Sequence, residues 1–176
     1  SDVADAITLL ASDVNQRLEL GRNNSIVGER FFNRLTSYKE LLPLIDIDSV
    51  KGKVIIIANF ASRLDGTANG RFTYLAEMIA SSGVNVEVIT STFRHSTKTN
   101  DNSVTGVYKS NIILIPEPGY SKNISLKRLY SHWVWGRNVR KYLDSLNQVP
   151  SVIYCAIPSV TVAVQAAKYC KKCRNL

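Results

Sequence analysis

The loop at residues 64–72, LDGTANGRF, has residue types suited to ligand binding. Gly66 and Gly70 would let a ligand approach the backbone, and free amides at the start of a following helix favour anions. The loop also offers side chains that could hydrogen-bond a hydroxylated or phosphorylated ligand: Asp65, Asn69 and Arg71. It matches neither GxGxxG nor a Walker A loop, because no Gly-Lys-Ser/Thr follows. A ligand loop and a plain turn both remain open.

Two histidines and three cysteines are the other candidates for chemistry. His95 follows an expected strand in a polar loop, where sites concentrate, whereas His132 falls inside an expected helix. Cys170 and Cys173 have C-x-x-C spacing, but they end a helix instead of opening one, and zinc would need two further ligands. We therefore expect no metal site, and no residue stands out as catalytic. With Cys155, the cysteines are too few for a disulfide framework, which favours a reducing, cytosolic compartment.

An α/β domain must position these residues, because strands alternate with helices from residue 53 onward. Strands are expected at 54–59, 84–91, 111–115 and 151–156, helices at 70–82, 125–146 and 160–172, and a polar loop at 92–106. The first strand is nearly all β-branched and apolar, which is typical of a strand buried on both faces of a parallel sheet. We predict a Rossmann-like three-layer parallel sheet that binds ligands beyond the carboxyl ends of its strands.

Two amphipathic helices are expected before this domain. One apolar stripe runs through residues 2–20, the sequence GRNNS at 21–25 breaks it, and a second runs through 27–42 and ends at Pro43. Such stripes pack on the domain, on each other or on a partner. We therefore divide the chain into a helical extension, residues 1–50, and an α/β domain, residues 51–176.

The net charge of +8 is concentrated in the last third of the chain. Residues 120–176 contain 10 Lys and Arg against 1 Asp, so this segment alone carries +9. The asymmetry favours an anionic partner, and a solvated basic face is the other interpretation. We expect no membrane-spanning helix, because no apolar run reaches about 18 residues, and the N-terminus does not resemble a signal peptide.

The expected helix at 125–146 has two apolar sets that point roughly 150° apart. The first set comprises Leu126, Leu129, Tyr130 and Trp133, and the second follows Gly136. Either the helix kinks or ends near Gly136 and packs in the ordinary way, or its first half turns apolar side chains outward. In the second case they line up with basic residues, as on an interfacial membrane surface: Arg137, Arg140 and Lys141.

Residues 59–98 resemble the opening of bacterial family-four glycosyltransferases of capsule and lipopolysaccharide synthesis. The matching features are, in order, Asn59-Phe60, Gly66, Asn69-Gly70-Arg71-Phe72, Leu75-Ala76, Thr90-Ser91 and Phe93-x-His95-x-x-Lys98. The later segments GYSKNISLKRLYSH (119–132) and IYCAIPS (153–159) resemble the same group. The resemblance covers roughly residues 53–174, so the two N-terminal helices lie outside it.

The resemblance implies an enzyme of the GT-B fold, in which two Rossmann-like domains face each other across a cleft. The N-terminal domain mainly holds the acceptor, and the C-terminal domain binds the nucleotide-sugar and carries paired glutamates; the family retains configuration at the transferred sugar. This chain corresponds to the acceptor-side domain alone, so we expect it to be inactive without the donor domain. No cofactor is expected in the chain itself, because the nucleotide-sugar belongs to the missing domain.

The resemblance also implies site residues and partners. Gly66, Asn69, Gly70 and Arg71 would form the cleft loop near donor phosphates and acceptor. His95 and Lys98 would edge the acceptor site, whereas three further cations would contact acceptor pyrophosphate or anionic lipid: Lys122, Lys127 and Arg128. The implied partners are a nucleotide-sugar and a glycan or lipid-linked acceptor, with an anionic membrane surface as a further candidate and no nucleic acid. The expected location is cytoplasmic, with peripheral attachment at the inner membrane face as an option. The alternative is a catalytically silent module that binds a membrane surface or a partner protein.

Overall fold

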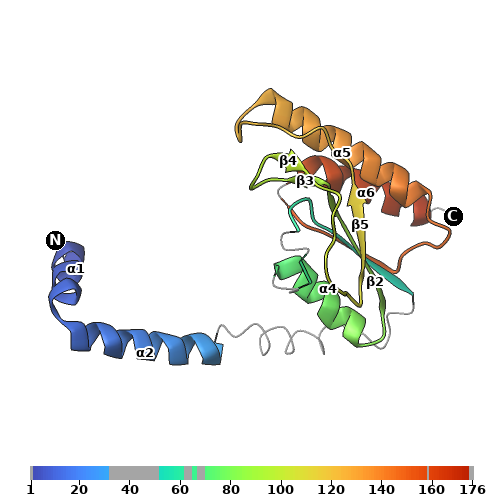
Figure 1. Ribbon diagram of the computed structural model, residues 1–176. Coiled ribbons are helices and arrows are strands. Elements are labelled where there is room, and N and C mark those ends of the chain that lie inside the picture. Colours follow the sequence, from blue (N-terminus) through green and yellow to red (C-terminus); the bar gives the residue numbers. More distant parts are fainter. Residues whose placement is uncertain (1, 32–51, 62–64, 67–69, 158, 175–176) are drawn as a thin grey trace. The chain divides into compact units, whose positions relative to one another are not determined.

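The computed structural model describes residues 2–31, 52–61, 65–66, 70–157 and 159–174. The chain divides into two compact units, Ser1–Asp46 and Ile47–Leu176. The described part of the first unit consists of two helices, α1 (Asp2–Ser12) and α2 (Val14–Phe31) (Figure 1). The helices described in the two units include none that is long and apolar enough to cross a membrane.

The interruption between α1 and α2 lies at Asp13, so the expected break at residues 21–25 is wrong. Asp13 begins α2 because its Oδ1 accepts the Gln16 backbone N–H at 3.0 Å, the bond that a helix-capping carboxylate makes. Arg17 closes the end of α1 by donating from Nη1 to the carbonyl oxygens of Leu10 and Ala11. These polar contacts set the boundary, and α2 continues through the Gly-Asn-Asn-Ser tract. The rest of the second expected stripe, beyond residue 31, lies outside the described residues.

The second unit contains a four-stranded parallel sheet, as predicted. Its strands lie in the order β5-β2-β1-β6, with bounds β5 (Asn111–Ile115), β2 (Asn85–Ser91), β1 (Lys53–Ile57) and β6 (Val152–Cys155). β1 pairs with β2 from Lys53↔Asn85 to Ile57↔Ile89, and it pairs with β6 on its other side. The chain thus builds outward from β1 in one direction and then returns to the other side of β1, as in doubly wound α/β folds.

Helices cover both faces of this sheet and make a three-layer α/β domain. α4 (Arg71–Ser81) lies on one face, and α5 (Leu126–Asp144) and α6 (Val160–Arg174) lie on the other (Figure 1). Successive β1 side chains point to opposite faces. Ile55 and Ile57 join a core with residues of α5 and α6, namely Trp135, Val139, Leu143, Val162 and Ala166, whereas Val54 and Ile56 pack with Ala76 and Ile79 of α4. The near-continuous apolar sequence of β1 therefore reflects burial on both sides.

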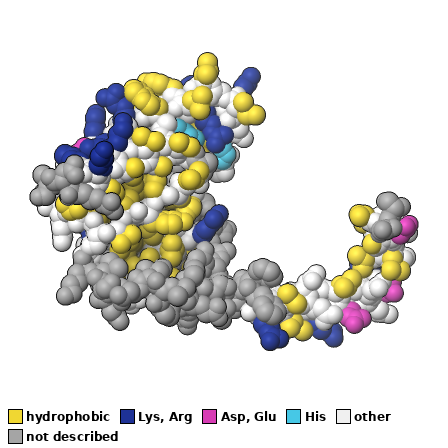
Figure 2. All heavy atoms as spheres, turned by 180° about the vertical axis from the view of Figure 1, so that it is seen from behind, with side chains coloured by type: hydrophobic (Ala, Val, Ile, Leu, Met, Phe, Trp, Pro, Cys, Tyr) yellow, Lys and Arg dark blue, Asp and Glu magenta, His cyan; other side chains and the backbone are white. Residues whose placement is uncertain are grey.

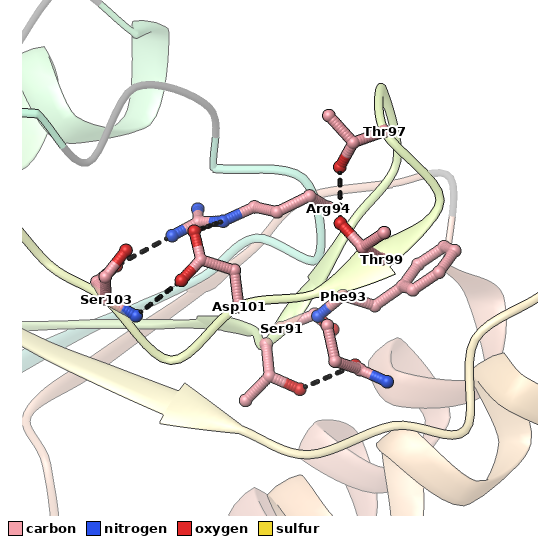
Figure 3. Close-up of polar contacts among 9 residues, drawn as sticks. Ser91, Phe93, Arg94, Thr97, Thr99, Asp101 and Ser103 are labelled. Carbon is pink, nitrogen blue, oxygen red and sulfur yellow. Dashed lines mark hydrogen bonds and ion pairs between the residues drawn. The ribbon is translucent and has the colours of Figure 1, made fainter.

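A short antiparallel hairpin lies within the segment that we expected to be a polar loop. It pairs β3 (Phe93–Arg94) with β4 (Thr99–Asn100). Figure 3 shows how Arg94 reaches across its base, donating to the Ser103 carbonyl at 2.8 Å and lying 3.4 Å from Asp101. Asp101 Oδ1 in turn accepts the Ser103 N–H at 2.8 Å. These contacts order the segment that carries His95 and Lys98.

α5 is one uninterrupted helix through Gly136. The interpretation that the helix kinks or ends near Gly136, so that both apolar sets pack in the core, is therefore wrong. Leu126 and Leu129 remain 83% and 65% exposed, and the structure thus bears out the outward placement of the first set. A Cβ on Gly136 would lie 3.2 Å from the Thr161 carbonyl carbon and from the Val162 nitrogen. The glycine therefore permits close packing of α5 on α6 and is not a helix break.

Candidate functional site

Buried polar side chains gather where the strands of the sheet end. Asn59 follows β1, Glu117 follows β5 and Ser159 follows β6, and these residues are 4%, 5% and 1% exposed. Asn59 Nδ2 donates to Glu117 Oε2 at 3.4 Å, so the loops after β1 and β5 meet. Among the described residues, one oxygen of each of these side chains has no hydrogen-bond partner. Because buried polar atoms are normally paired, this edge of the sheet is a candidate for ligand contact.

The His95–Tyr120 pair forms the centre of the site. His95 comes from the hairpin turn and Tyr120 from the loop before α5, and His95 Nδ1 lies 2.8 Å from the Tyr120 hydroxyl. The Phe60 ring packs beside them, 4.9 Å from His95 and 5.8 Å from His132 of α5 between ring centroids. Loops after three strands and the first turns of α5 thus contribute to one aromatic cluster, defined here as Phe60, His95, Tyr120 and His132.

Two polar groups approach Nδ1 of His95. The Tyr120 hydroxyl lies 2.8 Å from it and Lys98 Nζ lies 3.2 Å from it. Burial lowers the pKa of His95, and the positive charges of Lys98 and Arg128 lower it further. Burial is also the main cause that lowers the pKa of His132, followed by Arg128. Both imidazoles are therefore set to be neutral near pH 7.

Two cations face the ring of Tyr120. Lys98 Nζ lies 4.9 Å and Arg128 Cζ 5.5 Å from its centroid. Both hold the loop at Asn123, where Lys98 donates to Oδ1 at 2.6 Å and Arg128 to the carbonyl oxygen at 2.8 Å. No carboxylate among the described residues pairs with either cation. The site is therefore electropositive and can accept an anionic group.

The backbone of Lys98 adopts an unfavourable conformation. Its φ of 59° lies in the left-handed region. Among the described residues, it is the non-glycine residue with a positive φ. The hairpin turn enforces this geometry, since the Lys98 N–H donates to the Arg94 carbonyl at 2.8 Å. Such strain costs about 1 kcal/mol or more and is common at functional sites.

Two pockets flank the aromatic cluster. A pocket of about 310 Å³ lies over the strand ends and is lined by Asn59, Phe60, Ser91, Arg94 and His95, among others. A second pocket, of about 520 Å³, lies at the start of α5. Its lining combines apolar side chains, Ile124, Leu126 and Leu129, with the polar Asn123, Arg128 and His132. Both pockets therefore combine polar and apolar side chains and suit an amphipathic ligand.

Glu117 is a buried acidic group beside this site, because it contacts Asn59 of the first pocket. Burial raises its pKa, and hydrogen bonds from Ser91, Asn59 and Ser131 oppose that effect. Burial likewise raises the pKa of Tyr120. Glu117 therefore holds the loop after β5 in place with a carboxyl group that is easily protonated, while the cations dominate the accessible surface.

The structure brings three of the predicted site residues together: His95, Lys98 and Arg128. Lys122 and Lys127 are exposed beside this cluster, in the loop before α5 and on its first turn. Figure 2 shows basic and hydrophobic side chains around the two histidines at the top of that view.

The remaining predicted residues belong to the loop between β1 and α4. Gly66 has a φ of 83° and donates its N–H to the Tyr108 hydroxyl at 2.7 Å, so this amide is already engaged. Gly70 is the residue before α4, and Arg71 is exposed in its first turn, with its guanidinium 5.4 Å from the Phe72 ring. Asn69 lies outside the described residues. None of the described contacts of the aromatic cluster includes this loop.

Sequence reasoning missed Tyr120 and Glu117 as parts of the site. Both lie in the segment Pro-Glu-Pro-Gly-Tyr directly after β5, and a carboxylate just past a buried strand was the available signal. Gly119, between them, has a φ of 79°, and a Cβ there would come within 2.6 Å of the Phe93 ring. This tight turn delivers Tyr120 to His95.

The comparisons with known proteins return no match, whether to a family model, a curated protein or a solved structure. Within the described residues, no group of three or more His, Cys, Asp or Glu side chains could hold a metal ion. The three cysteines are free thiols. The chemistry of the site therefore has to be argued from its cations, its neutral imidazoles and its pockets.

Proposed function

We propose that this chain is the acceptor-side domain of a glycosyltransferase that moves a sugar from a nucleotide-sugar to a lipid-linked or polysaccharide acceptor. The nucleotide-sugar would bind to a second domain that faces the carboxyl edge of the sheet. The order of the segments between residues 59 and 159 that resemble family-four glycosyltransferases supports this proposal. The parallel sheet supports it as well, because such sheets bind ligands where the aromatic cluster lies.

The observation that carries the proposal is the pair of cations around Tyr120. Lys98 and Arg128 approach the ring to 4.9 Å and 5.5 Å and have no carboxylate partner among the described residues. Two neighbouring cations fit a pyrophosphate, whose charges are spread over two linked groups. The pockets on either side would take the rest of a lipid-linked acceptor, with the sugar near His95 and the first lipid units along Leu126 and Leu129.

In this arrangement His95 binds the acceptor through Nε2. In the tautomer in which Nδ1 accepts from Lys98, the Nε2–H donates to an acceptor hydroxyl. Asn59, whose Oδ1 is unpaired among the described residues, lines the same pocket and supplies a complementary acceptor. Together they can bind both sides of a sugar hydroxyl.

A binding titration tests the proposal. Polyprenyl-pyrophosphoryl-N-acetylglucosamine in detergent micelles is titrated into the chain, and tryptophan fluorescence is recorded. We expect saturable binding that Lys98→Gln and Arg128→Gln each weaken by roughly tenfold, the loss of one charge-assisted contact. The control variant Lys168→Gln, on the exposed side of α6, should bind like the wild type. Tight binding of a free nucleotide-sugar with none of the lipid pyrophosphate would contradict the assignment.

A catalytically silent docking module is the second candidate function, and the exposed apolar face of α5 favours it. Such a module would bind membranes or a partner through that face but would show no specific affinity for the lipid pyrophosphate. The titration above therefore separates the two candidates.

A further inference from the structure

The outward face at the start of α5 carries a group of large hydrophobic side chains. We define the α5 face as Ile124, Leu126, Leu129, Tyr130 and Trp133. These residues are 96%, 83%, 65%, 57% and 46% exposed. Soluble surfaces often expose single apolar residues, but four on the first turns of one helix, with Ile124 just before it, mark an interaction site.

The orientation of α5 is fixed, so this face cannot turn inward. The opposite side of the helix buries Trp135, Val139 and Leu143, each 0% exposed, against the sheet and α6. Gly136 sits against the α6 backbone, where even a Cβ would come within 3.2 Å of Thr161 and Val162. The core thus holds the apolar face toward solvent.

Basic residues flank the face. Residues 120–139 contain four basic residues and no acidic residue: Lys122, Lys127, Arg128 and Arg137. Further along α5, Arg140 is paired with Asp144 at 2.7 Å. Two aromatic side chains of the face stack on each other, Tyr130 and Trp133, with centroids 6.2 Å apart. Arg137 lies over the Trp133 ring at 5.0 Å. Amphipathic aromatics next to Lys and Arg match the interface between acyl chains and headgroups.

We propose that the α5 face docks the protein on an anionic lipid bilayer. Ile124, Leu126 and Leu129 enter the boundary of the acyl chains, Tyr130 and Trp133 lie at the headgroups, and the flanking cations contact anionic lipid. Charge complementarity selects this occupant, since a segment without acidic residues attracts a surface of negative charge.

This inference rests on exposure and charge, so it stands whether or not the acceptor proposal holds. Docking would also bring the 520 Å³ pocket to the bilayer surface, because that pocket and the α5 face share Ile124, Leu126 and Leu129. A lipid-anchored ligand could then enter the pocket without leaving the membrane.

Co-sedimentation of the intact chain with vesicles tests the docking. Vesicles are made of phosphatidylcholine alone or of phosphatidylcholine mixed with phosphatidylglycerol. We expect binding to the mixed vesicles only, with release at high salt. Leu126→Ser and Leu129→Ser should each weaken partitioning by roughly tenfold through lost apolar burial. Lys127→Gln should weaken it roughly fivefold.

Matched controls separate docking from misfolding and from general stickiness. Val107→Ser removes an apolar side chain that is 93% exposed elsewhere on the domain, and it should leave binding unchanged. Circular dichroism and the thermal midpoint confirm that the leucine variants fold. Binding that ignores lipid charge, or no binding at all, would overturn the proposal. So would a soluble dimer that Leu126→Ser dissociates, because a second copy would then be the occupant.

Discussion

Lys98 allows the backbone strain of the site to be measured apart from its charge. Its φ of 59° costs a residue with a Cβ about 1–2 kcal/mol, and glycine avoids this cost. Its ammonium meanwhile contacts the Tyr120 ring at 4.9 Å and Asn123 Oδ1 at 2.6 Å. Two substitutions remove the same ammonium but treat the backbone differently, namely Lys98→Gly and Lys98→Gln.

The two variants should differ in stability in a defined direction. Lys98→Gln keeps the strain and loses the contacts with Tyr120 and Asn123, so its free energy of unfolding should fall by about 1 kcal/mol. Lys98→Gly loses the same contacts but relieves the strain. The greater conformational entropy of glycine in the unfolded chain offsets part of this gain. Lys98→Gly should therefore be more stable than Lys98→Gln by about 0.5–1 kcal/mol.

Urea denaturation followed by circular dichroism measures this difference, provided that both variants show the same m-value. Both variants should also lose affinity for the lipid pyrophosphate, because each lacks the ammonium. If Lys98→Gln proved as stable as Lys98→Gly or more so, the turn would hold no strain at this position. The backbone conformation of Lys98 would then have no cost in stability.

Three further predictions concern the core and the titrating groups. Gly136→Ala should lower the free energy of unfolding by about 1–3 kcal/mol, because its Cβ would meet the Thr161–Val162 backbone at 3.2 Å; an unchanged thermal midpoint would argue against close α5–α6 packing. His132→Gln should flatten the loss of stability between about pH 7 and pH 5. Burial lowers the pKa of His132 in the folded chain, so the unfolded chain takes up the proton first as the pH falls, and the stability of the wild type decreases. Identical pH profiles of the wild type and the variant would count against this. Glu117→Gln should raise stability more at about pH 7 than at about pH 4, because burial raises the pKa of Glu117 and only its charged form is costly; equal effects at both pH values would contradict it.

Much of the parallel sheet could be predicted from the sequence because its signals are local. The apolar run of β1 indicates burial on both faces, and the predicted helix at 70–82 matches α4, which spans Arg71–Ser81. Gly83 follows this helix with a φ of 84°, as a C-terminal glycine should. Periodicity also located α5. The mismatch of its two apolar sets left a kinked helix and an exposed apolar face open, and the structure has the exposed face.

The parts that were missed depend on contacts between distant residues. The β3–β4 hairpin has two-residue strands with no apolar pattern, and the tie from Arg94 to Asp101 and Ser103 orders it. The start of α2 depends on a carboxylate cap at Asp13, and the helix continues through the glycine-asparagine tract. The boundary of the N-terminal helices was therefore misplaced.

The candidate site could be predicted only in part for the same reason. His95, Lys98 and Arg128 were identified by motif, but their meeting at Tyr120 depends on loops after separate strands. Gly66, in contrast, is explained by its own backbone, since a Cβ there would lie 2.8 Å from the Gly106 Cα. Residue type alone did not distinguish a residue of the site, such as His95, from a glycine that the backbone requires, such as Gly66.

Photo-crosslinking tests the central claim most directly. A polyprenyl-pyrophosphate-linked sugar that carries a diazirine on the first lipid unit is irradiated with the intact chain, and the labelled peptides are identified by mass spectrometry. The account predicts labels in the segment that lines the 520 Å³ pocket, residues 123–132, and their loss with Arg128→Gln. Labels confined to α6 or to the loop between β1 and α4, unaffected by Arg128→Gln, would show that the acceptor lies elsewhere.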